Sequence, residues 1–364
     1  MKLTRSVRHN IIANFTGNVW RGVFNLAFIP VYIKLMGVEV YGLLGVFMSL
    51  SALFVLLDMG LSTTLSRELS RLSVIENSAQ ESRNLVRTFE VVYWLIGIVI
   101  GASVIILAPL IAEYWINSAS ISTEIIEQTL LIMGMLLAFQ WPRAIYIGGL
   151  EGLQRQVLYN VIKTLSMLAR HIGAVLVLTF ISPSILYFFY WQSLVALITT
   201  IVLAVYLWKS LPKSNGQSKF DKNLFVKNWK FVSGVMGISL GTVLLVQIDK
   251  IILSKMLTLE VFSYYMLATT VATVIMSLVS PIHTALFPRL SQLVVKKDEN
   301  GISDLYHRGC QLASIIILPI SITMIFFSKE ILSTWIGDPT VVNNTHMLLS
   351  VLLTTVGSPI QVER

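Results

Sequence analysis

Five polar residues recur along one side of the first apolar segment of the chain: Asn10, Asn14, Asn18, Arg21 and Asn25. Their spacing of three or four places them within about 80° of one another on a helix, because each residue advances by roughly 100°. A charge at membrane depth is costly in lipid, so we expect Arg21 to face a water-filled cavity or a partner. The stripe therefore predicts a cavity wall; polar packing between helices is the alternative.

Two further cations lie in the apolar segment 161–181. Lys163 and Arg170 fall on one face of the helix expected there, and Arg170 lies near its middle. Arginine offers forked donors and lysine a point charge, and both suit a diphosphate anion. The two cations are therefore candidate ligands of a diphosphate, or else they pair with carboxylates such as Asp58 or Glu90.

Three further charges lie inside apolar segments, namely Asp58, Asp249 and Lys250. Intramembrane carboxylates often serve ion coupling, so the two aspartates are candidate proton or sodium sites, with structural salt bridges as the alternative. Neighbouring residues on a helix point about 100° apart, so Asp249 and Lys250 are each expected to need a separate partner. No cofactor or metal site is expected, since a structural zinc site needs several ligands and Cys310 is the single cysteine.

The composition indicates the environment of these charges. Of the 364 residues, 55% are hydrophobic and only 13% are charged, and the mean hydropathy is +0.75. Soluble domains are about one quarter charged, so the chain is predicted to be an all-α polytopic membrane protein. The net charge of +8 does not indicate nucleic acid, because the basic residues lie between apolar segments and form no single patch.

Apolar segments long enough to cross a bilayer, about 20 residues each, set the topology. About ten transmembrane helices are predicted, at 10–35, 42–65, 89–112, 127–149, 161–181, 185–208, 230–254, 260–284, 306–327 and 345–361. Lysine and arginine are concentrated before the first of these segments and in every second loop after it. By the positive-inside rule, the N-terminus is cytoplasmic and each even-numbered helix ends in the cytoplasm.

The chain contains an internal repeat with an offset of about 220 residues, as in the match between Trp115 and Trp335. We expect an N-terminal six-helix bundle at 1–208, a basic cytoplasmic linker at 209–229 and a C-terminal bundle at 230–364. An even number of helices per half gives parallel repeats. At this offset the second bundle ends after about four helices, two fewer than the first.

Several short motifs carry a resemblance to a known family. They are the first-helix asparagines with Arg21, then Tyr41-Gly42, Leu57-Asp58-Met59-Gly60, Gln247-Ile248-Asp249-Lys250 and Phe287-Pro288-Arg289-Leu290. In these the chain resembles the polysaccharide (O-antigen and exopolysaccharide) flippases of the multidrug/oligosaccharidyl-lipid/polysaccharide exporter superfamily. The resemblance implies two pseudo-repeated helical bundles around a central cavity that opens alternately to each side, with 12 helices in a complete member.

The resemblance implies a transporter and not an enzyme. Its expected task is to move a polyprenyl diphosphate-linked oligosaccharide to the outer leaflet of the bacterial inner membrane for surface polysaccharide biosynthesis. Expected partners are this lipid-linked glycan, membrane lipids, a polysaccharide polymerase and other assembly proteins. The expected substrate-binding residues are Asn14, Asn18, Arg21, Asn25, Lys163 and Arg170.

Two alternatives stay open. A cation-coupled multidrug or toxin antiporter of the related extruder branch typically carries a carboxylate in its first helix, and the segment 10–35 contains no Asp or Glu. A membrane glycan polymerase or ligase needs an accessible set of acid, base or metal groups, usually on a sizeable loop. The predicted outer loops are short, which favours transport.

Overall fold

The structure is a computed structural model that describes residues 22, 24–55, 58, 60–214, 216–224, 226, 246–277, 286, 293 and 298–357. This part of the chain is helical, and its one β-type pairing is an isolated bridge between Asn117 and Thr258. The chain forms two compact units. The first unit holds Leu35–Leu259, and the second holds the described residues up to Lys34 together with those from Glu260 onward.

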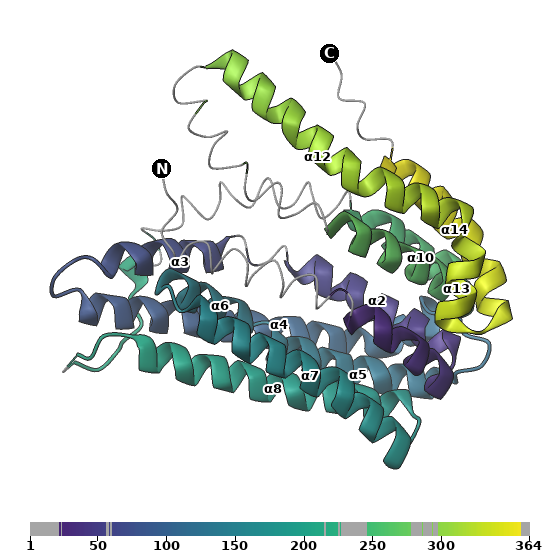
Figure 1. The fold of residues 1–364 in the computed structure, drawn as a ribbon. Helices are drawn as coiled ribbons and strands as arrows, with labels where there is room; N and C mark the ends of the chain where they lie inside the picture. Colours follow the sequence, from purple (N-terminus) through teal and green to yellow (C-terminus); the bar gives the residue numbers. More distant parts are fainter. Residues whose placement is uncertain are drawn as a thin grey trace. The chain divides into compact units, whose positions relative to one another are not determined.

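The helices of the two units confirm the predicted all-α membrane fold (Figure 1). The first unit contains α2 (Val38–Val55), α3 (Leu61–Leu72), α4 (Ala79–Tyr114), α5 (Thr123–Gln140), α6 (Arg143–Gly152), α7 (Gln156–Phe180) and α8 (Ile185–Ser210). The second unit contains α10 (Leu259–Ser277), α12 (Glu299–Phe326), α13 (Ser328–Ile336), α14 (Pro339–Gly357) and most of the helix Phe24–Met36. Five helical segments are long and apolar enough to cross a membrane: Ala79–Tyr114, Thr123–Gly152, Gln156–Phe180, Ile185–Ser210 and Glu299–Phe326.

The predicted span 42–65 is not one helix. It is divided into α2 and α3, with Asp58 in a short helical turn between them. Gly60 precedes α3 with φ 75°, a left-handed conformation that costs other residues about 1–2 kcal/mol. The break therefore has a local cause in the glycine.

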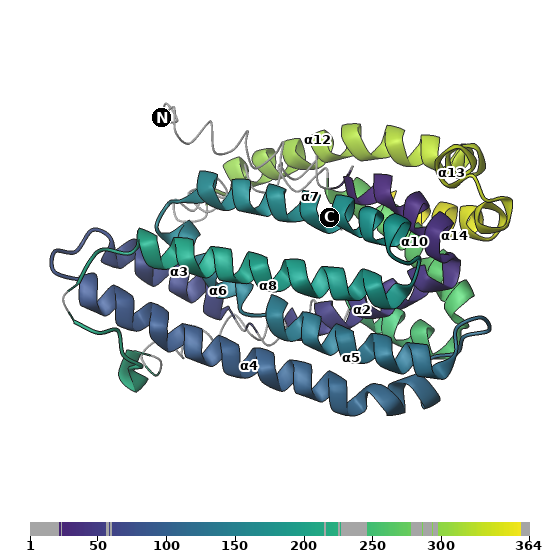
Figure 2. The same ribbon diagram turned by 90° about the horizontal axis from the view of Figure 1, so that it is seen from below.

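The predicted span 127–149 is also divided, because Pro142 lies between α5 and α6. Proline has no N–H and its ring interrupts helical hydrogen bonding. The helix predicted at 89–112 is continuous. It is α4, which begins ten residues before the predicted start at Phe89. Figure 2 shows α4, the longest helix of the first unit, along one side of that unit.

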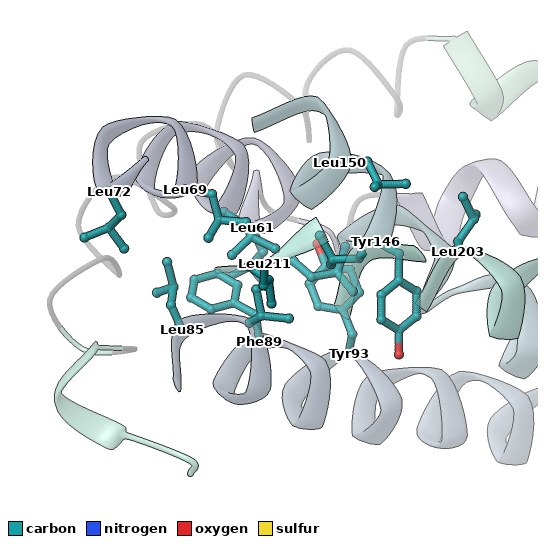
Figure 3. Packing of buried hydrophobic residues seen from close by; sticks show 14 of the residues in the cluster. Leu61, Leu69, Leu72, Leu85, Phe89, Tyr93, Tyr146, Leu150, Leu203 and Leu211 are labelled. Atoms are coloured by element: carbon teal, nitrogen blue, oxygen red, sulfur yellow. The ribbon is translucent and has the colours of Figure 1, made fainter. Parts of the chain in front are cut away.

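A buried leucine stripe holds α3 onto α4. Leu61, Leu65, Leu69 and Leu72 recur at helical spacing and are at most 2% exposed. They pack with Phe89 and other side chains of α4, α6 and α8 (Figure 3). Because arginines occupy the opposite side of α3, this short helix is amphipathic and its burial is specified by sequence. We refer to this end of the first unit, which carries Arg67, Arg71, Arg83, Arg87 and Lys209, as the basic end.

Part of the predicted linker lies along α4 at the basic end. Gln80, Asn84 and Thr88 are spaced by four residues and so share one face of α4. The side-chain amide of Gln80 donates to the carbonyl of residue 217 (2.9 Å), and Asn84 and Thr88 accept from the backbone N–H groups of Lys219 (3.0 Å) and Asp221 (2.8 Å). These bonds fix the register of the strap, residues 212–221, on the helix.

Candidate substrate cavity

Asp58 lies at the wall of a cavity of about 310 Å³ in the first unit. Its Oδ2 accepts a hydrogen bond from the hydroxyl of Ser62 (2.9 Å), and its Oδ1 accepts one from the hydroxyl of Tyr93. Both donors come from neighbouring helices, α3 and α4, so the carboxylate is held at the break between α2 and α3. We call this space the Asp58 cavity. The lining residues are Ser51, Phe54, Asp58, Ser62, Leu137, Gln140, Trp141, Arg143, Ala144 and Ile147.

Arg143 gives the Asp58 cavity a cation that the sequence reasoning missed. It is the first residue of α6, directly after Pro142. The available signal was a charged residue inside the predicted span 127–149, because ionisable residues at membrane depth are functional candidates by default.

Arg170, a predicted ligand, reaches the same wall through a second residue. Its Nη2 donates to Oε1 of Gln140 (2.9 Å), and Gln140 lines the Asp58 cavity. The backbone carbonyl of Arg170 accepts from the amide of Gln192 on α8 (3.3 Å). The structure therefore places Arg170 one hydrogen bond behind the cavity surface.

Lys163, the other predicted cation of this helix, lies about two turns nearer the basic end. Its Nζ lies 5.0 Å from the ring centre of Tyr159, and it interacts electrostatically with Glu151 of α6. Such cation–π contacts are worth about 0.5–1 kcal/mol at exposed sites. Lys163 and Arg170 thus interact with different helices of the first unit, α6 and α5 respectively.

The two carboxylates considered as alternative partners have well-defined donors. Glu90 accepts from Arg87 (2.9 Å), from the hydroxyl of Tyr146 (2.7 Å) and from the indole N–H of Trp208 (3.2 Å). Asp58 accepts from the two hydroxyls described above. The Glu90 cluster ties α4, α6 and α8 together beside the cavity.

A second cavity of about 620 Å³ runs between α3 and α6 toward the basic end. We call it the α3–α6 groove. It shares Ser62, Ala144 and Ile147 with the Asp58 cavity, so the two spaces adjoin. The other lining residues are Thr63, Ser66, Arg67, Ser70, Gly148, Glu151, Gly152, Gln154 and Gln156.

At the opposite end of the first unit, Glu39 gathers four hydrogen bonds. Its carboxylate accepts from the hydroxyls of Ser118 (2.6 Å) and Ser120 (2.7 Å) and from the backbone N–H groups of Ala119 (3.3 Å) and Ser120 (3.2 Å). Burial raises the pKa of Glu39, but these bonds together outweigh burial and hold the pKa below its usual value of 4.5. Glu39 is 7% exposed.

The same loop is bonded to the start of the second half of the sequence. The N–H of Leu259 donates to the carbonyl of Asn117 (2.7 Å), and the indole of Trp115 donates to the hydroxyl of Ser254 (3.1 Å). Lys255 lies 5.1 Å above the ring of Trp115. We call Glu39, residues 115–120 and residues 254–259 the distal cluster.

Asp249 and Lys250 lie on the helical stretch 246–256 of the first unit. Lys250 Nζ donates to the carbonyl of Val246 (2.7 Å) and lies 3.6 Å from Oδ1 of Asp249. Lys250 thus has the separate partner that was expected, and it also forms an ion pair with its neighbour, because the long lysine side chain folds back along its own helix.

The predicted first-helix stripe is described only at its end. Asn25 lies exposed on the helix Phe24–Met36, whereas Asn14, Asn18 and Arg21 lie outside the described residues. Among the residues that the structure describes, no group of three or more His, Cys, Asp or Glu side chains could hold a metal ion.

The arrangement of the helices is shared with solved membrane transporters. An inward-facing multidrug resistance MATE family transporter of the MOP superfamily matches with a TM-score of 0.72 at 10% identity, covering 96% of this chain and 79% of that chain. The lipid II flippase MurJ, in an inward closed conformation, matches with a TM-score of 0.68 at 17% identity, covering 94% and 71%. A MOP superfamily transporter from Pyrococcus furiosus matches with a TM-score of 0.65 at 14% identity, covering 96% and 79%. The likeness shows that this chain shares the fold of these solved transporters.

Family models narrow the class. The model described as "Polysaccharide biosynthesis protein" matches residues 7–294, and the MatE model matches residues 235–361. Among curated protein sequences, none matches this chain significantly. The chain belongs to the polysaccharide biosynthesis protein family.

Proposed function

We propose that this protein moves a polyprenyl diphosphate-linked oligosaccharide from the cytoplasmic to the outer leaflet of the bacterial inner membrane, for surface polysaccharide biosynthesis. The observation that carries the proposal is the placement of cations at the Asp58 cavity. Arg143 lines the cavity, and Arg170 reaches its wall through Gln140 at 2.9 Å. Arginine fits diphosphate oxygens with paired donors, so this wall suits an anionic headgroup better than a cationic drug.

The two ends of the first unit support alternating access. The α3–α6 groove lies toward the basic end, which the positive-inside rule assigns to the cytoplasm, whereas the distal cluster is tied by hydrogen bonds. A substrate would enter from the basic end, and the distal cluster would have to open before release. Two solved structures that share this fold are described as inward-facing and inward closed.

Coupling to a proton or sodium gradient belongs to the same proposal, with Asp58 as its site. Asp58 is a carboxylate on the cavity wall, held by hydroxyls from two helices. Asp58→Asn keeps the size of the side chain and one of its two acceptor oxygens but removes the titratable group. Transport by this variant should no longer respond to an imposed ion gradient, while transport down a substrate gradient continues.

The sidedness of the lipid-linked oligosaccharide in cells tests the proposal. In a strain that lacks the chromosomal gene, an impermeant label on spheroplasts should find the glycan lipid on the cytoplasmic face. Complementation with the wild-type chain should return it to the outer face, and Arg143→Ala should not. Arg155→Ala is the matched control, because Arg155 is an exposed cation on the same unit, outside the Asp58 cavity.

The outcomes separate the two transport functions. Unchanged sidedness in the deletion strain, in the absence of a second translocase, would refute flipping. Increased sensitivity of that strain to cationic drugs would then favour multidrug transport, since its MATE relative is a multidrug resistance transporter.

A further inference from the structure

Six of the twelve residues that line the α3–α6 groove are neutral and polar. Ser62, Ser66 and Ser70 are spaced by four residues along α3, and Gln154 and Gln156 also line the groove. Hydroxyls and amides each donate and accept hydrogen bonds, as sugar hydroxyls do. The volume of about 620 Å³ lies within the usual range of small-molecule sites, about 300–1,000 Å³.

The charges of the groove argue against an anion at this position. Its cation, Arg67, donates to the neighbouring Glu68 at 2.9 Å, and Glu151 contributes a carboxylate to the lining. The cations suited to a diphosphate, Arg143 and Arg170, belong to the adjoining Asp58 cavity. The two spaces therefore differ in chemistry.

The floor of the groove is rigid because α3 and α6 touch through their backbones. A Cβ atom added at Gly148 would lie 2.4 Å from the carbonyl oxygen of Ser62, and one added at Gly152 would lie 2.4 Å from that of Ser66. Small residues spaced by four allow such close helix packing in membranes. The serine hydroxyls are thereby held at fixed positions along the groove.

We infer that the α3–α6 groove binds uncharged sugar residues of the glycan headgroup, next to the diphosphate at the Asp58 cavity. This inference rests on the proposed function and deepens it. Ser62 connects the two parts, because it lines both spaces and its hydroxyl donates to Asp58. A diphosphate bound near Arg143 would direct its first sugars into the groove.

Transport of two lipids by the full chain in proteoliposomes tests the inference. The probes are a polyprenyl diphosphate that carries a neutral hexose disaccharide and the same polyprenyl diphosphate without sugar. Ser70→Leu fills the exposed mouth of the groove without entering the α3–α6 contact, and Ser66→Leu fills its middle. Ser73→Leu, directly after α3 and outside the groove, is the matched control.

We expect both groove variants to raise the KM for the disaccharide lipid by about tenfold or more, as expected from losing one or two hydrogen bonds. The sugar-free lipid and the control variant should be unaffected. Equal effects on both lipids, or no effect of Ser70→Leu on the disaccharide lipid, would overturn the sugar site while leaving flipping intact. Failure of the wild-type chain to move either lipid would instead overturn the proposed function, and the inference with it.

Discussion

Removing the carboxylate of Glu39 should open the distal cluster. Glu39→Ala deletes the acceptor of all four hydrogen bonds that bind α2 to residues 118–120. The hydroxyls of Ser118 and Ser120 lose their acceptor, and the backbone N–H groups of Ala119 and Ser120 must donate to water instead. Glu39→Gln keeps the length of the side chain but removes the negative charge, so the variants separate packing from charge.

The magnitude follows from the two shortest bonds, at 2.6 and 2.7 Å. A hydrogen bond to a charged group contributes about 1.5–3 kcal/mol, and bonds that share one acceptor do not add fully. We therefore expect Glu39→Ala to destabilise the closed cluster by about 2–4 kcal/mol, which is an increase of about 30- to 1,000-fold in the open fraction. Glu39→Gln should cost about half as much free energy.

Accessibility to an impermeant maleimide measures the open fraction. The reporter is Ser254→Cys in a Cys310→Ser background, since Ser254 is only 5% exposed in the closed cluster. Labelling from outside the cell should increase in Glu39→Ala and stay unchanged in Glu113→Ala, an exposed carboxylate near the same end of α4. Equal labelling of the reporter alone, of the reporter with Glu39→Ala and of the reporter with Glu113→Ala would refute the view that Glu39 holds the cluster closed.

Further predictions concern pH, the helix break, the core and the cation wall. The pKa of Glu39 is lowered, so the stabilisation that Glu39 gives the closed distal cluster is complete above pH 4.5 and is lost as the pH falls below that value. Maleimide labelling measured against pH should show this loss in the wild type and no such pH dependence in Glu39→Gln. Gly60→Ala at φ 75° should cost about 1–2 kcal/mol in thermal unfolding, and Leu69→Ala, fully buried, about 2–5 kcal/mol. Gln140→Leu removes the acceptor of Arg170 and should lower transport without reducing insertion, measured by flipping per inserted molecule.

How far the sequence specifies the fold can be argued from α3 and its neighbours. Hydropathy alone predicts a continuous span at 42–65, because the segment is apolar throughout its first half. The leucine periodicity after Gly60, with arginines on the opposite side, is the signal for a separate amphipathic helix. The strap on α4 could not be predicted. Its backbone groups bond to α4 side chains that lie 129–137 residues away along the chain, and a polar composition does not indicate such distant partners.

The candidate site was predictable in type but not in position. Intramembrane charge singled out Asp58 and Arg170, because ionisable groups are rare at that depth. The structure places Asp58 on the cavity wall and Arg170 one hydrogen bond behind it. Their neighbours could not be deduced, since the hydroxyl of Tyr93 and the amide of Gln140 come from helices whose rotation the sequence leaves open. Arg143 was visible as a charge after Pro142, but only the structure places it on the same cavity as Asp58.

The two repeated tryptophans show what the internal repeat specifies. The indole of Trp115 donates to Ser254 on the helical stretch 246–256, and the indole of Trp335 donates to the carbonyl of Leu26 (3.1 Å). Ser254 lies in the first predicted helix of the second half of the sequence, and Leu26 lies in the first predicted helix of the first half. Each tryptophan therefore bonds to the first helix of the opposite half. Each compact unit accordingly includes a first helix from the other half, with the chain crossing between units at Lys34–Leu35 and at Leu259–Glu260. The crossing points lie next to Glu39 and within the distal cluster, so the bonds that we expect to break during transport are those that secure the exchanged helix.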